Sequence, residues 1–355
     1  MKKWILSLVS LASLCAFAQE TTKITAGKHN DFGLAYSLPN TMADIKIDVT
    51  KISVKAGPYY QYAEKYLGVQ EIITEDMEYW EMNHIEIIPT GVANPEESYL
   101  VKFKGGNPPS MYLSAEGTLL SINMEPPVIP ATPTKQANTA KAINQTPTYS
   151  VLTEEQLAAG STAKMAEMAA KQIYRIRESR LNLVTGDVDQ LPADGESFKL
   201  IMKQLDEQEA TLTAMFLGTT QKENIQKVIR VNPAEKTGKD ILFRFSKYLG
   251  VVSTDNLAGA PVYLTIKVIE DLRPANTPEA IKQKKKDKNK GVAYVMPGKI
   301  SATLTSENKT LANVEFAVAQ LGEIVQFPTD MFDDKKAPAK AVFTPETGAV
   351  LEVIQ

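Results

Sequence analysis

The chain has 355 residues, of which 43% are hydrophobic and 23% charged, so its length predicts two domains and its apolar content a buried core. Its 39 basic and 42 acidic side chains nearly balance, which argues against a dedicated nucleic-acid binder. One cysteine and two histidines leave few of the usual zinc ligands, and we expect neither a metal site of that kind nor another cofactor.

A secretory signal is predicted over residues 1–18, where two lysines precede an apolar run that is too short for a good membrane span. The small-x-small tripeptide at its end predicts cleavage before Gln19, which also removes the only cysteine, Cys15. A lipoprotein anchored through Cys15 is the alternative, although Leu14 stands where a lipobox has a small side chain. No later run is long and apolar enough for a transmembrane helix, so we expect a periplasmic, secreted or outer-membrane-associated protein.

The pentapeptide KYLGV occurs twice, at residues 65–69 and 247–251, and each copy begins a stretch with a similar ending. Self-similarity of this kind predicts an internal duplication. We therefore expect an α+β, mostly β protein with two related antiparallel β-rich halves, a first domain over residues 19–125 and a second over residues 219–355.

Strands are predicted around both copies, because β-favouring residues recur there in short runs bounded by turn residues. The clearest runs are residues 45–49, 80–88, 225–231 and 261–269. Gly117 and Gly348 each stand between two β-rich runs, where a hairpin requires a positive φ. The second half is longer and carries a further strand-like pair at residues 314–319 and 323–327.

Each KYLGV copy is predicted to end a short amphipathic helix. In the first copy Tyr59, Tyr62 and Tyr66 recur at helical spacing, so their rings are expected to face inward, and Gly68 follows as a helix stop. In the second copy an apolar stripe over residues 241–249 predicts the equivalent helix.

Two segments separate the β-rich halves. Residues 126–151 are rich in Pro, Thr and Ala and predict an exposed linker. Residues 152–218 predict an antiparallel helical hairpin, in which a capping box at Thr153 starts the first helix and Asp194 caps a second helix that stops at Gly218.

The resemblance to a known family lies in four segments: GPYYQYAEKYLG, the stretch from IYRIRESRLNLVTG to LPADG, FRFSKYLGV and PETGA. The chain resembles an uncharacterised family of exported proteins from Bacteroidetes-type bacteria, a domain of unknown function, over nearly the whole mature length. The resemblance implies a Gram-negative envelope setting, and it assigns no catalytic residue.

Serine acyl transfer is the most tempting catalytic pattern. Residues 161–164 match S-x-x-K and residues 236–238 match K-T-G, two elements of penicillin-binding proteins. The third element, S-x-N, should lie between them, but the nearest similar residues, 253–256, follow K-T-G. K-T-G is also predicted to lie in a turn instead of a strand, so we expect no acylation of Ser161 and assign no catalytic residue.

Charged side chains cluster in the helical hairpin. Asp187, Asp189 and Asp194 lack the glycine that a calcium loop needs, and capping or ion pairing is the preferred interpretation. Arg177 and Arg180, near the end of the first long helix, are candidates for an anion site, with structural ion pairs as the alternative.

Two further groups are candidates for binding. Tyr60, which leaves the inward-facing stripe, and Trp80 could stack a sugar, although aromatic clusters at this spacing usually belong to the core. A basic run that includes Lys284, Lys285 and Lys286 could contact an anionic envelope surface, with a solvated loop as the alternative.

The sequence therefore predicts an exported, non-enzymatic cell-envelope protein that binds or scaffolds another protein or a glycan. The alternative is a carboxylate-based hydrolase such as a glycosidase, which needs only two positioned acids and leaves no local motif. A cleft that holds two carboxylates about 5 to 9.5 Å apart would favour the hydrolase. Acids engaged in salt bridges would favour the binding protein.

Overall fold

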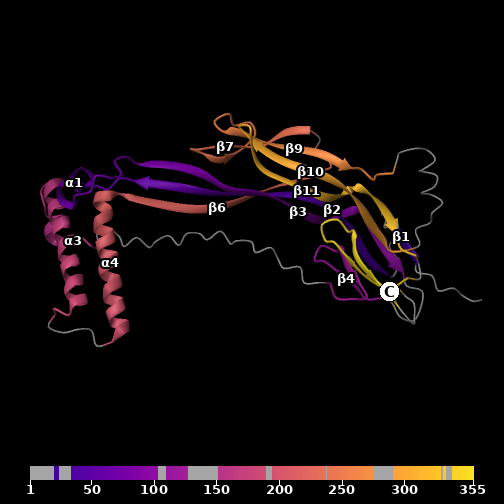
Figure 1. Ribbon diagram of the computed structural model, residues 1–355, viewed down its shortest axis with the longest axis horizontal. Helices are drawn as coiled ribbons and strands as arrows, with labels where there is room; N and C mark the ends of the chain where they lie inside the picture. The colour runs from indigo at the N-terminus through magenta and orange to yellow at the C-terminus, as the bar shows by residue number, and fades with distance from the viewer. Residues whose placement is uncertain are drawn as a thin grey trace, which may run out of the picture.

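The computed structural model describes residues 20–23, 33–102, 109–126, 151–188, 194–236, 238–274, 291–328, 331–332 and 338–355. The predicted signal segment, nearly all of the predicted linker and the lysine run lie outside these residues. The described chain is an elongated α+β protein in which antiparallel sheets dominate and the helices gather at one end (Figure 1). The mostly β, antiparallel class predicted from the sequence is confirmed.

The first sheet forms the long body of the molecule. It has the strand order β1 (Glu20–Lys23), β3 (Met77–Lys102), β2 (Leu34–Lys55) and β6 (Thr219–Val231), and all of its strands pair antiparallel. Ile45, Ile47 and Val49 alternate with polar residues and point into the core, as their period of two predicts. The strands extend well beyond the predicted runs and carry the sheet to the helical end.

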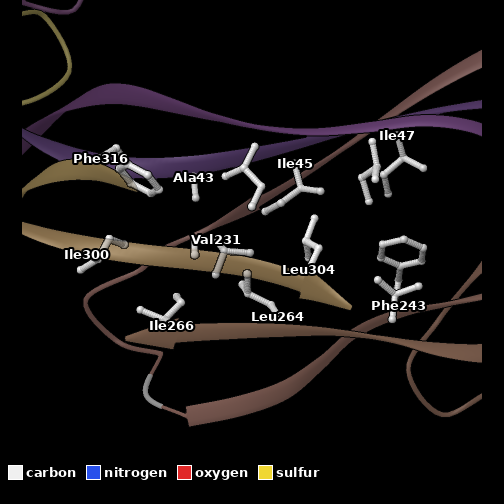
Figure 2. Packing of buried hydrophobic residues seen from close by; sticks show 14 of the residues in the cluster. Ala43, Ile45, Ile47, Val231, Phe243, Leu264, Ile266, Ile300, Leu304 and Phe316 are labelled. Atoms are coloured by element: carbon white, nitrogen blue, oxygen red, sulfur yellow. The ribbon is translucent and has the colours of Figure 1, made fainter. Parts of the chain in front are cut away.

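The second sheet packs on one face of the first. Its order is β11 (Lys309–Gln326), β10 (Ala293–Ser306), β9 (Ala260–Glu270), β7 (Gly238–Ser246) and β8 (Gly250–Val252). Figure 2 shows Ile45 and Ile47 of the first sheet facing Leu304 and Phe243 of the second. The two strands predicted at residues 314–319 and 323–327 belong to the single strand β11.

The third sheet is small and lies at the end of the molecule opposite the helices (Figure 1). Its order is β13 (Val350–Ile354), β12 (Lys340–Phe343), β5 (Leu119–Ile122) and β4 (Met111–Leu113). Gly117 and Gly348 have φ of 84° and 68°, which confirms both predicted hairpin turns. The Tyr36 hydroxyl joins β2 of the first sheet to β10 of the second, because it donates to the carbonyl oxygen of Ala293 at 3.0 Å and accepts from its N–H at 2.7 Å.

The helical end contains η1 (Tyr60–Tyr62), α1 (Ala63–Leu67), α2 (Glu154–Leu157), α3 (Thr162–Thr185) and α4 (Gly195–Leu217). The predicted capping box at Thr153, the cap at Asp194 and the stop at Gly218 are all confirmed. The box starts only the one-turn helix α2, however, and α3 begins separately with Ser161 as its cap. Apolar residues at the base of α3 and α4 form a third core with Tyr59 and Ala63.

The second KYLGV copy corrects the sequence analysis. The first copy ends α1 at Gly68 as predicted, but the predicted helix over residues 241–249 is wrong, because residues 238–246 form strand β7. Phe243 is buried against the first sheet. Because β7 pairs with β8 and β9, its backbone N–H and C=O groups form hydrogen bonds between strands. Tyr248 and Leu249 lie in the turn and are 70% and 53% exposed. The structural equivalence expected from a duplication is therefore absent at this motif.

The two predicted β-rich segments also share sheets. Strand β6, from the second segment, pairs with β2 over thirteen register positions, and β12 pairs with β5. The helical hairpin lies at one end of the long sheet, between β5 and β6 in the chain but not between two separate sheets in space (Figure 1).

Candidate functional site

The sequence-predicted site residues lie in different parts of the molecule. Tyr60 begins η1, is partly buried, and its hydroxyl accepts a hydrogen bond from Gln61 Nε2 at 3.1 Å. The three candidate lysines lie outside the described residues. Among the candidates that the structure places, only Arg177 and Arg180 come together.

Trp80 lies on strand β3 and packs against the main core. Its backbone N–H donates to the Lys247 carbonyl oxygen at 2.7 Å, which ties β3 to the turn that contains the second KYLGV copy. Gly250 of this turn lies against the indole so closely that a Cβ there would be 2.8 Å from Cδ2. The turn thus occupies part of the ring surface that a sugar would need.

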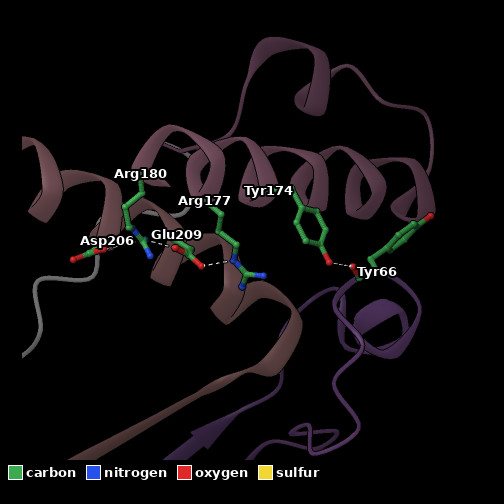
Figure 3. A network of polar contacts seen from close by, with 6 residues as sticks. All are labelled: Tyr66, Tyr174, Arg177, Arg180, Asp206 and Glu209. Carbon is green, nitrogen blue, oxygen red and sulfur yellow. Dashed lines mark hydrogen bonds and ion pairs between the residues drawn. The ribbon is translucent and has the colours of Figure 1, made fainter. Parts of the chain in front are cut away.

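The two arginines tie α3 to α4 (Figure 3). Arg177 Nε donates to Glu209 Oε1 at 2.7 Å, while Arg180 Nη2 pairs with Glu209 and lies 2.9 Å from Asp206 Oδ1. Burial opposes ionisation of Glu209, but the hydrogen bonds from Arg177 and Arg180 outweigh it and hold its pKa below the usual range. Both guanidinium groups are therefore engaged in a link between helices.

The carboxyl groups of the described residues are arranged for ion pairing. Asp44 accepts two hydrogen bonds from Arg230, at 2.7 and 2.8 Å, and these lower its pKa against the effect of burial. Every described carboxyl whose pKa departs clearly from its ordinary value is lowered, never raised: Asp44, Glu78, Glu167, Asp194, Glu209, Asp255 and Asp271. A general acid of a glycosidase needs the opposite shift.

The residues of the other sequence patterns also have structural roles. The Ser161 hydroxyl accepts a hydrogen bond from the Lys164 N–H at 3.3 Å and caps α3, so the S-x-x-K residues form a helix start. Lys236 of the K-T-G match pairs with Asp240 at 3.6 Å.

The His84 side chain is exposed, with Nε2 lying 3.9 Å from Glu86 Oε2. Within the described ranges no three His, Cys, Asp or Glu side chains are grouped closely enough to hold a metal ion.

Two of the pockets in the described part of the chain bear on this question. One, of about 320 Å³, is mostly apolar and lies beside β13, with Glu346 as its single carboxylate. The other, of about 380 Å³, lies between α2 and α3 and is lined by Lys164, Lys171 and Arg175 together with one carboxylate, Glu155. Neither pocket therefore holds a pair of carboxylates.

The helical hairpin has a base and a tip with very different packing. At the base, Ile173, Ile176 and Phe216 are among the buried residues. The described residues 178–188 and 194–208, here called the hairpin tip, contain no fully buried side chain. Large apolar side chains are exposed there instead, by 61% at Leu181, 66% at Val184, 58% at Leu200 and 36% at Ile201.

The exposed residues of the hairpin tip are not among the candidates predicted from the sequence, because the spacing of apolar residues does not show where along a helix pair they are buried. The stripe of α4 is buried only near its end, at Leu212, Met215 and Phe216. Adjacent apolar residues such as Leu200 and Ile201 could have given the signal, since neighbours on a helix do not share one narrow face.

These features define an elongated, mostly β protein that carries a helical hairpin at one end. The chain belongs to the family described as a domain of unknown function (DUF4831), whose model matches residues 32–351. The predicted resemblance to a family of unknown function is thereby confirmed. No curated protein and no solved structure was found to match the chain. Among the described helices, none has both the length and the hydropathy that a membrane span requires.

Proposed function

We propose that this protein is an exported, non-enzymatic protein of the bacterial cell envelope that holds a partner protein on its hairpin tip. The observation that carries the proposal is the exposure of Leu181, Val184, Leu200 and Ile201 on a segment without a buried side chain. Exposed apolar surface that the fold does not need usually marks a site of interaction.

The chemistry of the hairpin tip favours a protein over a glycan. Its exposed apolar side chains are aliphatic, and such side chains offer no hydrogen bonds to sugar hydroxyl groups. Exposed aliphatic side chains on a pair of helices can be buried against another apolar surface, such as a groove or a further helix. The Arg177 and Arg180 pairs with Glu209 hold α3 against α4 immediately beside the tip, so the surface is presented on a braced pair of helices.

The carboxyl groups support the binding protein more than the hydrolase. A hydrolase of the kind considered above is expected to have a cleft with two facing carboxylates. Each of the two pockets described above has one carboxylate, and the buried Asp44 carboxylate is held ionised by Arg230. The cell-envelope setting comes from the predicted signal over residues 1–18 and from the family resemblance.

The test compares binding by the chain from Gln19 onward and by two variants of it. The tip variant carries Leu181→Glu and Leu200→Glu, while the control, Leu257→Glu, makes the same change at a residue that is 82% exposed in a turn of the second sheet. Each is used to capture protein from a fractionated envelope extract, and circular dichroism verifies that all are folded.

We expect the wild type and Leu257→Glu to retain the same protein and the tip variant to lose at least nine-tenths of it. Equal retention by the tip variant would refute a role of the hairpin tip. Retention of glycan without protein, or hydrolysis of a glycan by the wild type, would refute the proposed function.

A further inference from the structure

A second surface lies at the opposite end of the molecule, on the edge strand β13. In the third sheet β13 pairs with β12 on one side, and no described strand pairs with its other side. One edge of residues 350–354 therefore presents backbone N–H and C=O groups to an incoming chain. A free edge is the template for β-strand addition.

Three of the other edge strands, β6, β4 and β8, carry features that discourage such pairing. Strand β6 has four charged residues along its length, Lys222, Glu223, Lys227 and Arg230, and β4 and β8 have only three residues each. Charge and short length are the usual protections of an edge. Strand β13 has the sequence VLEVI with one charge, and Leu351, Val353 and Ile354 are all exposed.

The apolar pocket of about 320 Å³ lies over the face of the third sheet, and β13 forms one of its walls. Leu351 of β13 lines it together with Leu120, Val342 and Pro345, so the pocket opens next to the strand. In strand addition the backbone supplies affinity, and pockets for individual side chains supply specificity. The pocket has room for one aliphatic side chain of a strand that pairs with β13.

The charges at the edge indicate the chemistry of the occupant. Glu352 stands in the middle of β13 and Glu346 lines the pocket, while Lys340 of β12 stands opposite Ile354 at the end of the strand. A second copy of β13 centred on the same residue would set two Glu352 side chains against each other, and like charges opposite one another destabilise a strand pair. A basic residue at that place on another chain would be attracted instead.

We propose that β13 binds an extended peptide segment of another protein by antiparallel or parallel strand addition. The segment has an aliphatic side chain that enters the pocket and a lysine or arginine that pairs with Glu352. This site is separate from the hairpin tip, and the proposal does not depend on the proposed function.

The test uses two fluorescein-labelled synthetic peptides, VTVKVTV and VTVEVTV, and measures their binding by fluorescence anisotropy. The variants are Leu351→Glu, which places a charge at the pocket, Glu352→Lys, which reverses the charge of the strand, and Leu257→Glu as the matched control. Circular dichroism and thermal unfolding show whether each variant is folded, and analytical ultracentrifugation measures self-association.

We expect the wild type and Leu257→Glu to bind the lysine peptide at least tenfold more tightly than the glutamate peptide. Leu351→Glu should weaken binding of the lysine peptide at least tenfold, and Glu352→Lys should reverse the preference. The tip variant should bind like the wild type, which separates this site from the hairpin tip.

Three results would overturn the proposal. They are the absence of binding of either peptide to the wild type, binding that Leu351→Glu and Glu352→Lys leave unchanged, and a dimer of the wild type that Leu351→Glu abolishes. The last result would show that a second copy of the chain occupies the edge. The charge reversal by Glu352→Lys keeps the test decisive even if Leu351→Glu does not fold.

Discussion

Gly68 and Gly250 occupy the same place in the two KYLGV copies, and alanine substitution should affect them very differently. Their φ angles are nearly equal, 68° and 73°, so the backbone strain of an alanine is the same at both positions. A Cβ on Gly68 meets no atom within 4 Å, whereas a Cβ on Gly250 would lie 2.8 Å from Trp80 Cδ2 and 3.0 Å from Cε3. The pair therefore separates backbone strain from packing.

The expected magnitudes follow from these two contributions. An alanine in the left-handed region costs about 1 kcal/mol relative to glycine. Overpacking of a filled site adds about 1 to 3 kcal/mol, because the ring is held by the core and must move. We expect Gly68→Ala to lower the free energy of unfolding by about 1 kcal/mol and Gly250→Ala to lower it by about 3 kcal/mol.

Urea unfolding followed by tryptophan fluorescence measures both quantities. The sequence has two tryptophans, Trp4 and Trp80, so a chain that starts at Gln19 reports on Trp80 alone. Before unfolding, the emission of Trp80 should change in Gly250→Ala and stay unchanged in Gly68→Ala. Equal destabilisation by the two substitutions, or an unchanged emission in Gly250→Ala, would refute the packing of the turn on the indole.

Three other substitutions test the polar contacts. Arg230→Met leaves the Asp44 carboxylate unpaired and should cost about 2 kcal/mol at pH 7. Because Arg230 lowers the pKa of Asp44, the pair stabilises the fold above pH of about 4 and loses this effect as the pH falls through the folded-state pKa. The free energies of unfolding of variant and wild type, measured by urea titration, should therefore converge in acid. Tyr36→Phe deprives the Ala293 N–H and C=O of their partner and should cost about 2 kcal/mol in the same assay. Ser161→Ala removes a helix cap and should cost about 1 kcal/mol, and a fluorescent penicillin should label neither this variant nor the wild type.

Local features of the fold could be predicted well from the sequence. The cap at Asp194, the helix stops at Gly68 and Gly218, and the hairpin glycines Gly117 and Gly348 all lie where their chemistry requires them. Each of these features is fixed by hydrogen bonds or φ angles within a few residues, so a short stretch of sequence contains the whole cause.

The pairing of distant segments could not be predicted in the same way. Strand β6 pairs with β2, and β12 pairs with β5, across long separations in the chain. The outer half of β6, with the sequence TTQKEN, has no apolar alternation, and its hydrogen bonds to β2 hold it in the sheet. Sequence periodicity detects the burial of side chains, so a strand that is held through its backbone gives little signal.

The candidate site residues show the same difference between what is local in the sequence and what depends on distant segments. The predicted residues Trp80, Arg177 and Arg180 were chosen for their chemical type, and each has structural partners that come from a distant segment: Lys247 and Gly250 for the indole, and Glu209 for both arginines. Chemical type can be read from the sequence, but the partner that engages a group depends on the tertiary fold. The exposed aliphatic residues of the hairpin tip have no unusual chemical type, and only their lack of burial distinguishes them.

The two KYLGV copies show how neighbouring sequence decides between helix and strand. In the first copy Pro58 and a run of residues with helical spacing precede the motif, so the chain enters it as a helix and Gly68 ends that helix. In the second copy ILFRF precedes it, and its apolar residues bury between the sheets as strand β7. The glycine is left-handed in both copies, so it is the one position where the motif imposes the same conformation. In the second copy Gly250, with its positive φ, lies where the turn between β7 and β8 ends, and this turn packs on Trp80.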